Sequence, residues 1–139
     1  MSFLKKSGGG ADWLAGVTLF HGFSAEELQR VADLGHEIEV AAGSVLVDQG
    51  DPGLDCFVIV SGAASVYIAG EYVTSLGEGS VVGEMALIDH RPRNATVVAD
   101  VDSRLLRFDA PAFRRLLEEM PKANERIQTV LTARLRRNA

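Results

Sequence analysis

The chain has 139 residues, which is enough for one domain with a real hydrophobic core. Apolar residues make up 47% of it, which excludes disorder over most of its length, and no apolar run approaches the length of a membrane span, which argues against membrane insertion. The net charge of −5 argues against nucleic acid as the main partner, and the single cysteine, Cys56, allows no disulfide within the chain, as expected for a cytoplasmic protein.

The N-terminal part of the chain contains one strong helix signal. Residues 1–11 include three consecutive glycines and lack the apolar core of a signal peptide, so we expect a flexible tail there. A short helix is expected from Asp12 to about Val17. Ser24 and Glu27 have the spacing of a capping box, which predicts a longer helix from there to about residue 34.

The apolar period changes to two from residue 36 onward, and short apolar runs follow. His36–Val40 alternates with the two glutamates between its members, and the apolar runs that follow are Val45–Val47, Phe57–Val60, Val66–Ile68, Val81–Val82, Val97–Ala99 and Leu105–Phe108. Glycine-rich turn signals separate many of them. Short strands at this spacing predict a sandwich or a jelly-roll barrel over about residues 36–108.

Two helices are expected at the C-terminal end, over about residues 109–137. Asp109 is a candidate N-cap with Pro111 in the first turn, and an apolar stripe follows until Pro121 breaks the helix. A second helix can start at that proline. Its apolar positions are Ile127, Val130, Leu131 and Leu135, and Arg134 falls on the same face.

The segment 83–97 combines groups that suit the two polar parts of a nucleotide. Gly83 can open a short helix, whose first backbone N–H groups form an anion site. Arg93 adds a permanent charge and a fork of donors for phosphate oxygens. Glu84 only accepts hydrogen bonds when ionised, so it suits a ribose hydroxyl. Either charged residue alone would fit an ordinary surface ion pair, but the joint pattern favours a nucleotide site.

This segment resembles the phosphate-binding cassette of cyclic nucleotide-binding domains. It matches the family pattern at Gly83, Glu84, Ala86, Leu87, Pro92, Arg93, Ala95, Thr96 and Val97. Met85 is a tolerated aliphatic residue, whereas Asn94 departs from the usual Ala, Ser or Thr. The resemblance covers about residues 12–137. It implies one mainly β domain: a jelly-roll-like barrel with N-terminal helices and two C-terminal helices.

The resemblance implies a non-enzymatic sensor of a 3′,5′-cyclic nucleotide, without a cofactor or metal. Asn94 fits neither the pattern typical of adenine nor that typical of guanine, so both cAMP and cGMP stay open, and we favour cAMP. Glu84 would take the ribose 2′-hydroxyl, and Arg93 would pair with the cyclic phosphate. The implied ligand-binding set is Gly83, Glu84, Met85, Ala86, Arg93, Asn94 and Ala95. The last helix would close over the base, with Leu131 and Arg134 as candidates for this lid. An effector protein or a fused effector domain would receive the signal.

Two alternatives belong to other functional classes. The first is a degenerate domain that serves only as a protein-interaction module; it predicts loss of Glu84 or Arg93, and both are present. The second is an enzyme of the metal-binding cupin barrels, which share a jelly-roll-like shape and need clustered histidines. The histidines here are scattered along the sequence at His21, His36 and His90.

Overall fold

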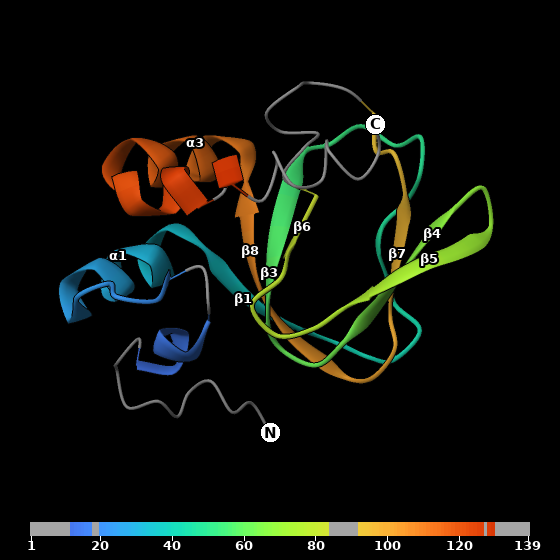
Figure 1. The fold of residues 1–139 in the computed structure, drawn as a ribbon, viewed down its shortest axis with the longest axis horizontal. Helices are drawn as coiled ribbons and strands as arrows, with labels where there is room; N and C mark the ends of the chain where they lie inside the picture. The colour runs from blue at the N-terminus through green and yellow to red at the C-terminus, as the bar shows by residue number, and fades with distance from the viewer. Residues whose placement is uncertain (1–11, 18–19, 84–91, 127, 130–139) are drawn as a thin grey trace.

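The computed structural model describes residues 12–17, 20–83, 92–126 and 128–129. Its strands are β1 His36–Val40, β2 Val45–Val47, β3 Asp55–Ser61, β4 Ala64–Ile68, β5 Glu71–Leu76, β6 Val81–Val82, β7 Thr96–Ala99 and β8 Ser103–Asp109. They form two antiparallel sheets, of order β1-β8-β3-β6 and β2-β7-β4-β5 (Figure 1). The predicted mainly β, jelly-roll-like fold is therefore confirmed.

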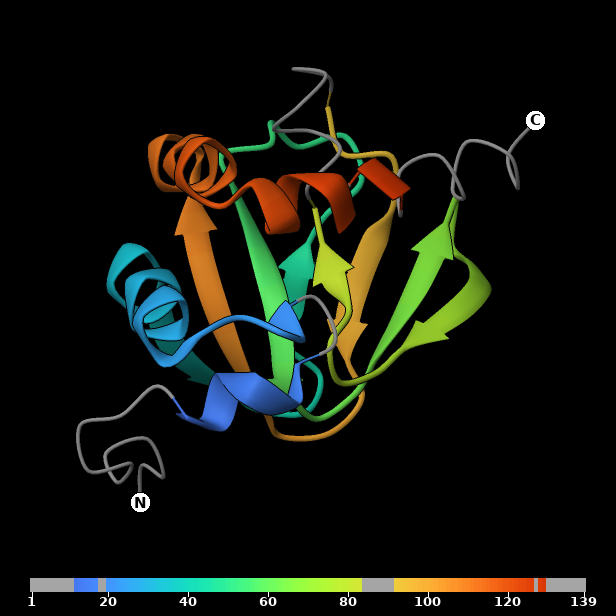
Figure 2. The ribbon, with the colours of Figure 1, turned by 60° about the vertical axis from the view of Figure 1, so that its left-hand side comes forward.

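The helices pack on the outer side of the first sheet (Figure 2). They are the 3₁₀ helix η2 Asp12–Gly16 and the α-helices α1 Ala25–Leu34 and α3 Ala110–Glu119. The capping box predicted for α1 is present: Ser24 Oγ accepts a hydrogen bond from Glu27 N, and Glu27 Oε1 accepts one from Ser24 N. This second bond lowers the pKa of Glu27. Asp109 caps α3 as predicted, by accepting a hydrogen bond from Ala112 N at 2.9 Å.

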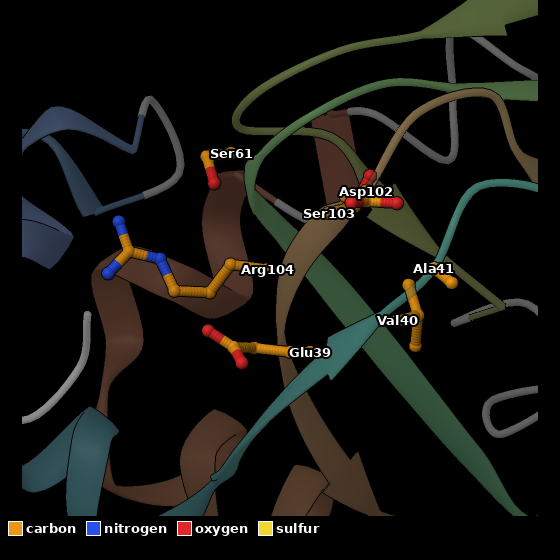
Figure 3. A pocket seen from close by; sticks show the side chains of 7 residues that line it. All are labelled: Glu39, Val40, Ala41, Ser61, Asp102, Ser103 and Arg104. Atoms are coloured by element: carbon orange, nitrogen blue, oxygen red, sulfur yellow. The ribbon is translucent and has the colours of Figure 1, made fainter. Parts of the chain in front are cut away.

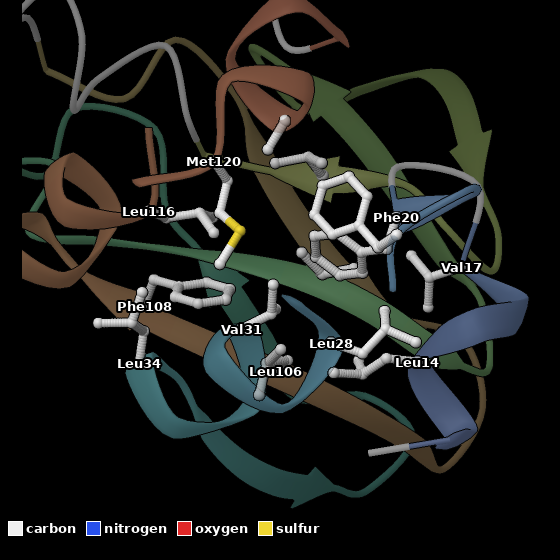
Figure 4. Packing of buried hydrophobic residues seen from close by; sticks show 14 of the residues in the cluster. Leu14, Val17, Phe20, Leu28, Val31, Leu34, Leu106, Phe108, Leu116 and Met120 are labelled. Carbon is white, nitrogen blue, oxygen red and sulfur yellow. The ribbon is translucent and has the colours of Figure 1, made fainter. Parts of the chain in front are cut away.

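Strand β3 is buried on both faces because it separates two hydrophobic clusters. Cys56 and Val58 face the cluster under the helices, which includes the residues labelled in Figure 4. Phe57 and Ile59 face the second cluster, between the two sheets. This double burial explains why the strand reads as a continuous apolar run and not as an alternating one. Because β3 is packed on both faces, residues at its ends are held in fixed positions.

Strand β5 was not predicted from the sequence. Its side chains are exposed on both faces except near Leu76, and Tyr72 and Val73 are more than half exposed. Figures 1 and 2 both show the β4–β5 hairpin projecting on the side away from the helices. A strand without a buried face leaves no alternation of apolar and polar residues, and the sequence therefore gives little sign of it.

Charged side chains connect the helices to each other. Arg30 in α1 and Glu119 in α3 form a two-bond ion pair, with Nη2 donating to Oε2 at 2.8 Å, and this contact lowers the pKa of Glu119. Helical turns continue at 121–126, where Lys122 and Arg126 place their charges over the Phe23 ring. None of the helices in the described residues is long and apolar enough to cross a membrane.

Candidate functional site

The two described ends of the predicted cassette lie against the start of β3. Gly83 directly follows β6, which pairs with β3 so that Val82 is opposite Phe57. Continuing this antiparallel register puts Gly83 opposite Cys56, next to Asp55, which is the first residue of β3. Arg93, which lies just before β7, sends its side chain to the same place. One end of the barrel thus gathers residues from three separate parts of the sequence.

Three hydrogen bonds to the described residues hold the guanidinium of Arg93. Its Nη1 donates to Gly83 O at 2.8 Å, and its Nη2 donates to Asp55 O at 2.6 Å and to Asp55 Oδ1 at 3.1 Å. The residue is only 7% exposed, so the charge sits where an unpaired cation would be costly. A guanidinium carries five N–H donors. These bonds leave two of the five, one on Nε and one on Nη1, unused by the described residues, and they fix the orientation of the guanidinium.

Gly83 admits the arginine by having no side chain. Its φ of +88° lies in the left-handed region, which favours glycine. A Cβ atom added there would lie 3.2 Å from Arg93 Cζ and 3.3 Å from Asp55 O, and closer still to Arg93 Nη1. Any larger residue would strain the backbone and push the guanidinium away. This glycine is therefore required by the position of Arg93.

Asp55 is shared by a second arginine, Arg107 of β8. Asp55 Oδ2 accepts a hydrogen bond from Arg107 Nε at 2.7 Å, while Oδ1 faces Arg93. The exposed fractions of the side chains rise from 6% for Arg93 to 22% for Asp55 and 37% for Arg107. Two guanidinium groups and one carboxylate give this Arg93–Asp55–Arg107 cluster a formal charge of +1.

The sequence analysis missed Asp55 and Arg107. They are 52 positions apart along the chain, and Asp55 is 38 positions from Arg93. The pairing of β3 with β8, which sets Phe57 opposite Arg107, brings Arg107 to Asp55, and the side chain of Arg93 reaches Asp55 from the segment before β7. The available signal was the charged residues at the start of β3 and along β8, and that signal does not say which charges meet.

The main chain of Arg93 is fixed as firmly as its side chain. Gly50 N donates to Arg93 O at 2.9 Å, and Arg93 N donates to Asp51 O at 2.8 Å. Both partners belong to the turn between β2 and β3. The backbone and the guanidinium are therefore both held by groups of the protein itself, which reduces the ordering that binding would require.

Comparison with known families agrees with this geometry. The family model described as cyclic nucleotide-binding domain matches residues 37–120, which is more than half of the chain. The chain belongs to the cyclic nucleotide-binding domain family. The resemblance found in segment 83–97 is thereby confirmed at the level of the family, whose domains are regulatory.

The proteins that resemble this domain include two larger regulators and one protein that the domain covers almost completely. This chain is 36% identical over 101 residues to the cAMP-dependent protein kinase type II regulatory subunit of Drosophila melanogaster, and the match covers 73% of this chain and 27% of that protein. The catabolite activator protein of Thermus thermophilus is 28% identical, with a TM-score of 0.78 over 86% of this chain and 59% of that one. A cyclic nucleotide-binding-like protein from Brucella abortus is 31% identical, with a TM-score of 0.63 over 78% and 97%.

The other predicted site residues of the domain divide into two groups. Asn94 is exposed and Ala95 is buried, and both directly follow Arg93. Glu84, Met85 and Ala86 lie outside the described residues, as do the lid candidates. The lid candidates are Leu131 and Arg134. For these five residues the sequence expectations stay predictions.

A cavity of about 400 Å³ lies at the opposite end of the first sheet (Figure 3). It is lined by Glu39, Val40, Ala41, Ser61, Asp102, Ser103 and Arg104. None of these residues was predicted to bind ligand, and none belongs to the Arg93–Asp55–Arg107 cluster. Among the described residues, no group of three His, Cys, Asp or Glu side chains is arranged to hold a metal ion.

Proposed function

We propose that this domain is a cytoplasmic, non-enzymatic sensor that binds a 3′,5′-cyclic nucleotide, with cAMP preferred over cGMP. The observation that carries the proposal is the guanidinium of Arg93, which Asp55 and Gly83 hold in place while leaving two N–H donors outside those bonds. The permanent charge and the remaining donors, on Nε and Nη1, suit phosphate oxygens.

The charge of the Arg93–Asp55–Arg107 cluster, counted without Glu84, favours a cyclic phosphate over a phosphate monoester. The Arg93–Asp55–Arg107 cluster carries a formal charge of +1. A cyclic phosphodiester carries one negative charge and would neutralise it, whereas a phosphate monoester carries about 1.5 to 2 negative charges near neutral pH. AMP would therefore bring an uncompensated charge as well as a different shape.

In this proposal the sugar and the phosphate are bound by different residues. Arg93 binds the cyclic phosphate, and Glu84 accepts a hydrogen bond from the ribose 2′-hydroxyl. The rest of the site is formed by Gly83, Met85, Ala86, Asn94 and Ala95. The preference for cAMP is supported by one relative, whose name is that of a cAMP-dependent protein kinase subunit. Asn94, where a small residue or a hydroxyl is usual, gives no clear preference of its own.

The sugar contact is tested by changing Glu84 and the hydroxyl together. Glu84→Gln keeps the shape but removes the charge-assisted acceptor, so we expect weaker binding of cAMP and a smaller penalty for 2′-deoxy-cAMP. Titration of both proteins with both ligands measures the coupling between the two groups. Equal losses for the two ligands would place Glu84 away from the ribose.

The signal would be produced by the C-terminal helix. We propose that it closes over the base, with Leu131 and Arg134 as the contacts, because the sequence spacing predicts that these two residues share one face of a helix and because a guanidinium stacks well on a flat ring. Hydrogen exchange in residues 123–136 should slow when cAMP saturates the protein. Exchange that is the same with and without cAMP would make this helix a fixed structural cap.

The receiver of the signal is an effector protein or an effector domain of the same polypeptide. The matched region is 27% of the Drosophila subunit, and the chain covers 59% of the Thermus activator structure. A ligand shifts the equilibrium between two states only by its difference in affinity for them. An effector should therefore bind this domain with an affinity that changes on addition of cAMP, and an affinity that does not change would rule that effector out.

A further inference from the structure

The turn between β2 and β3, residues 48–51, lies along the segment that contains Arg93. Gly50 N and Asp51 O form hydrogen bonds with the two main-chain polar groups of Arg93, at 2.9 and 2.8 Å. The turn is closed by Asp51 N donating to Asp48 O at 3.1 Å, and Gly50 has a φ of +92°. Any shift of this turn would therefore carry the backbone of Arg93 with it.

The hydroxyl group of Thr96 holds the same turn through two further hydrogen bonds. Thr96 Oγ1 accepts a hydrogen bond from Gln49 N at 2.9 Å and donates one to Asp48 Oδ1 at 2.9 Å. Thr96 is the first residue of β7, three positions after Arg93. The turn is thus attached twice to one short segment, through the main chain of Arg93 and through the side chain of Thr96.

The same turn also reaches the tip of the projecting β4–β5 hairpin. Gln49 Oε1 accepts a hydrogen bond from Ala69 N at 2.9 Å. Ala69 has a φ of +53°, a left-handed conformation that is uncommon for a residue other than glycine and typical of a tight turn. The hairpin tip, the β2–β3 turn and the segment 93–96 are therefore connected by hydrogen bonds in which Gln49 and Thr96 are the central members.

We propose that Thr96 is a positioning residue for phosphate recognition, which acts through the β2–β3 turn and Arg93 and does not touch the ligand. The proposal rests on the proposed function. Thr96 holds Asp48 and Gln49, the turn holds the main chain of Arg93, and Asp55 and Gly83 then direct its guanidinium. Without the Thr96 hydroxyl, the β2–β3 turn is held less firmly, whereas the hydrogen bonds from the guanidinium of Arg93 to Asp55 and Gly83 remain.

The substitution Thr96→Val separates this role from a general effect on folding. Valine keeps the branched shape that suits a strand, and Asp48 is exposed, so water can replace the lost hydrogen bond. We expect the melting temperature to fall by about 5 °C or less. We expect the affinity for cAMP to fall about five- to tenfold. This change corresponds to about 1.0–1.4 kcal/mol, which is the size of the contribution of one hydrogen bond.

Three further variants make the test specific. Thr96→Ser retains the hydroxyl and should bind cAMP within about twofold of the unchanged protein. Thr74→Val changes an exposed threonine of β5 in the same way and should leave the affinity unchanged. Asp48→Ala removes an exposed side chain that accepts from Thr96, so it should fold and should weaken binding in the same direction. This last variant decides the question even if Thr96→Val does not fold.

The affinities of cAMP analogues distinguish a positioning role of Thr96 from a merely structural one. The loss caused by Thr96→Val should be the same for cAMP and 2′-deoxy-cAMP, because the sugar is bound elsewhere. It should be smaller for the phosphorothioate diastereomer whose sulfur faces Arg93, because that contact is already weakened. Unchanged cAMP affinity in Thr96→Val, or an equal loss in Thr96→Ser, would overturn the positioning role alone. If the protein without substitutions binds neither cAMP nor cGMP, the proposed function is overturned as well.

Discussion

Replacing Arg93 with alanine should lower the affinity for cAMP by about a hundredfold or more. Truncating one partner of a buried, hydrogen-bonded charge pair costs about 2–5 kcal/mol, and each 1.4 kcal/mol corresponds to a tenfold change. Arg93 is 7% exposed and is already directed by Asp55 and Gly83, so it can meet the phosphate with little further ordering. Arg93→Lys should also lose affinity, because an ammonium group is a point charge and cannot reproduce the planar array of guanidinium donors that Asp55 and Gly83 orient.

Arg91→Ala is the matched control, since it removes the same type of residue two positions earlier. Arg91 lies outside the described residues, and its predicted role is that of a solvated neighbour. Titration of cAMP into each variant, with the melting temperature measured alongside, separates lost binding from lost folding. Equal losses for the two alanine variants would mean that the cassette has been misaligned.

The second large effect concerns stability and needs no ligand. Asp55→Asn should lower the free energy of unfolding by about 3 kcal/mol, because it leaves a nearly buried guanidinium without its carboxylate. Arg93 would retain its bonds to the two carbonyl oxygens of Gly83 and Asp55, while Arg107 is exposed enough to be hydrated. The cost therefore falls mainly on the charge of Arg93.

Asp51→Asn is the control for this prediction. Asp51 is exposed, and it holds Arg93 through its main-chain oxygen, which the substitution keeps. Its effect should stay within about 0.5 kcal/mol. Urea denaturation of the three proteins gives both values. A change for Asp55→Asn that is no larger than for Asp51→Asn would show that the carboxylate does not compensate the buried arginine.

Local signals in the sequence predicted the parts of the fold that depend on neighbouring residues. The capping box at Ser24 and Glu27 and the N-cap at Asp109 each lie within a few positions, and both are present in the structure. Strand β5 escaped prediction because its two faces are both exposed, so burial leaves no pattern in it. Short-range chemistry is readable from one sequence, whereas a strand defined only by pairing with its neighbour is not.

The candidate site shows the same division. The sequence pattern identified Gly83 and Arg93 because they belong to one ordered motif. It gave no sign that Gly83 is required by the close approach of Arg93, which becomes visible only from the contact between them. Asp55 and Arg107 were missed since their meeting depends on how β3, β6 and β8 are ordered in the sheet. Long-range contacts of this kind follow from topology.

The most direct test of the central claim is calorimetric titration of the unchanged protein with cAMP, cGMP and AMP in parallel. We predict saturable binding of cAMP at one site per chain, with weaker binding of cGMP. AMP should bind at least about tenfold more weakly than cAMP, because its extra charge is not matched by the cluster around Arg93. If the folded protein gives no saturable heat with cAMP or cGMP at millimolar concentration, the domain is not a cyclic nucleotide sensor.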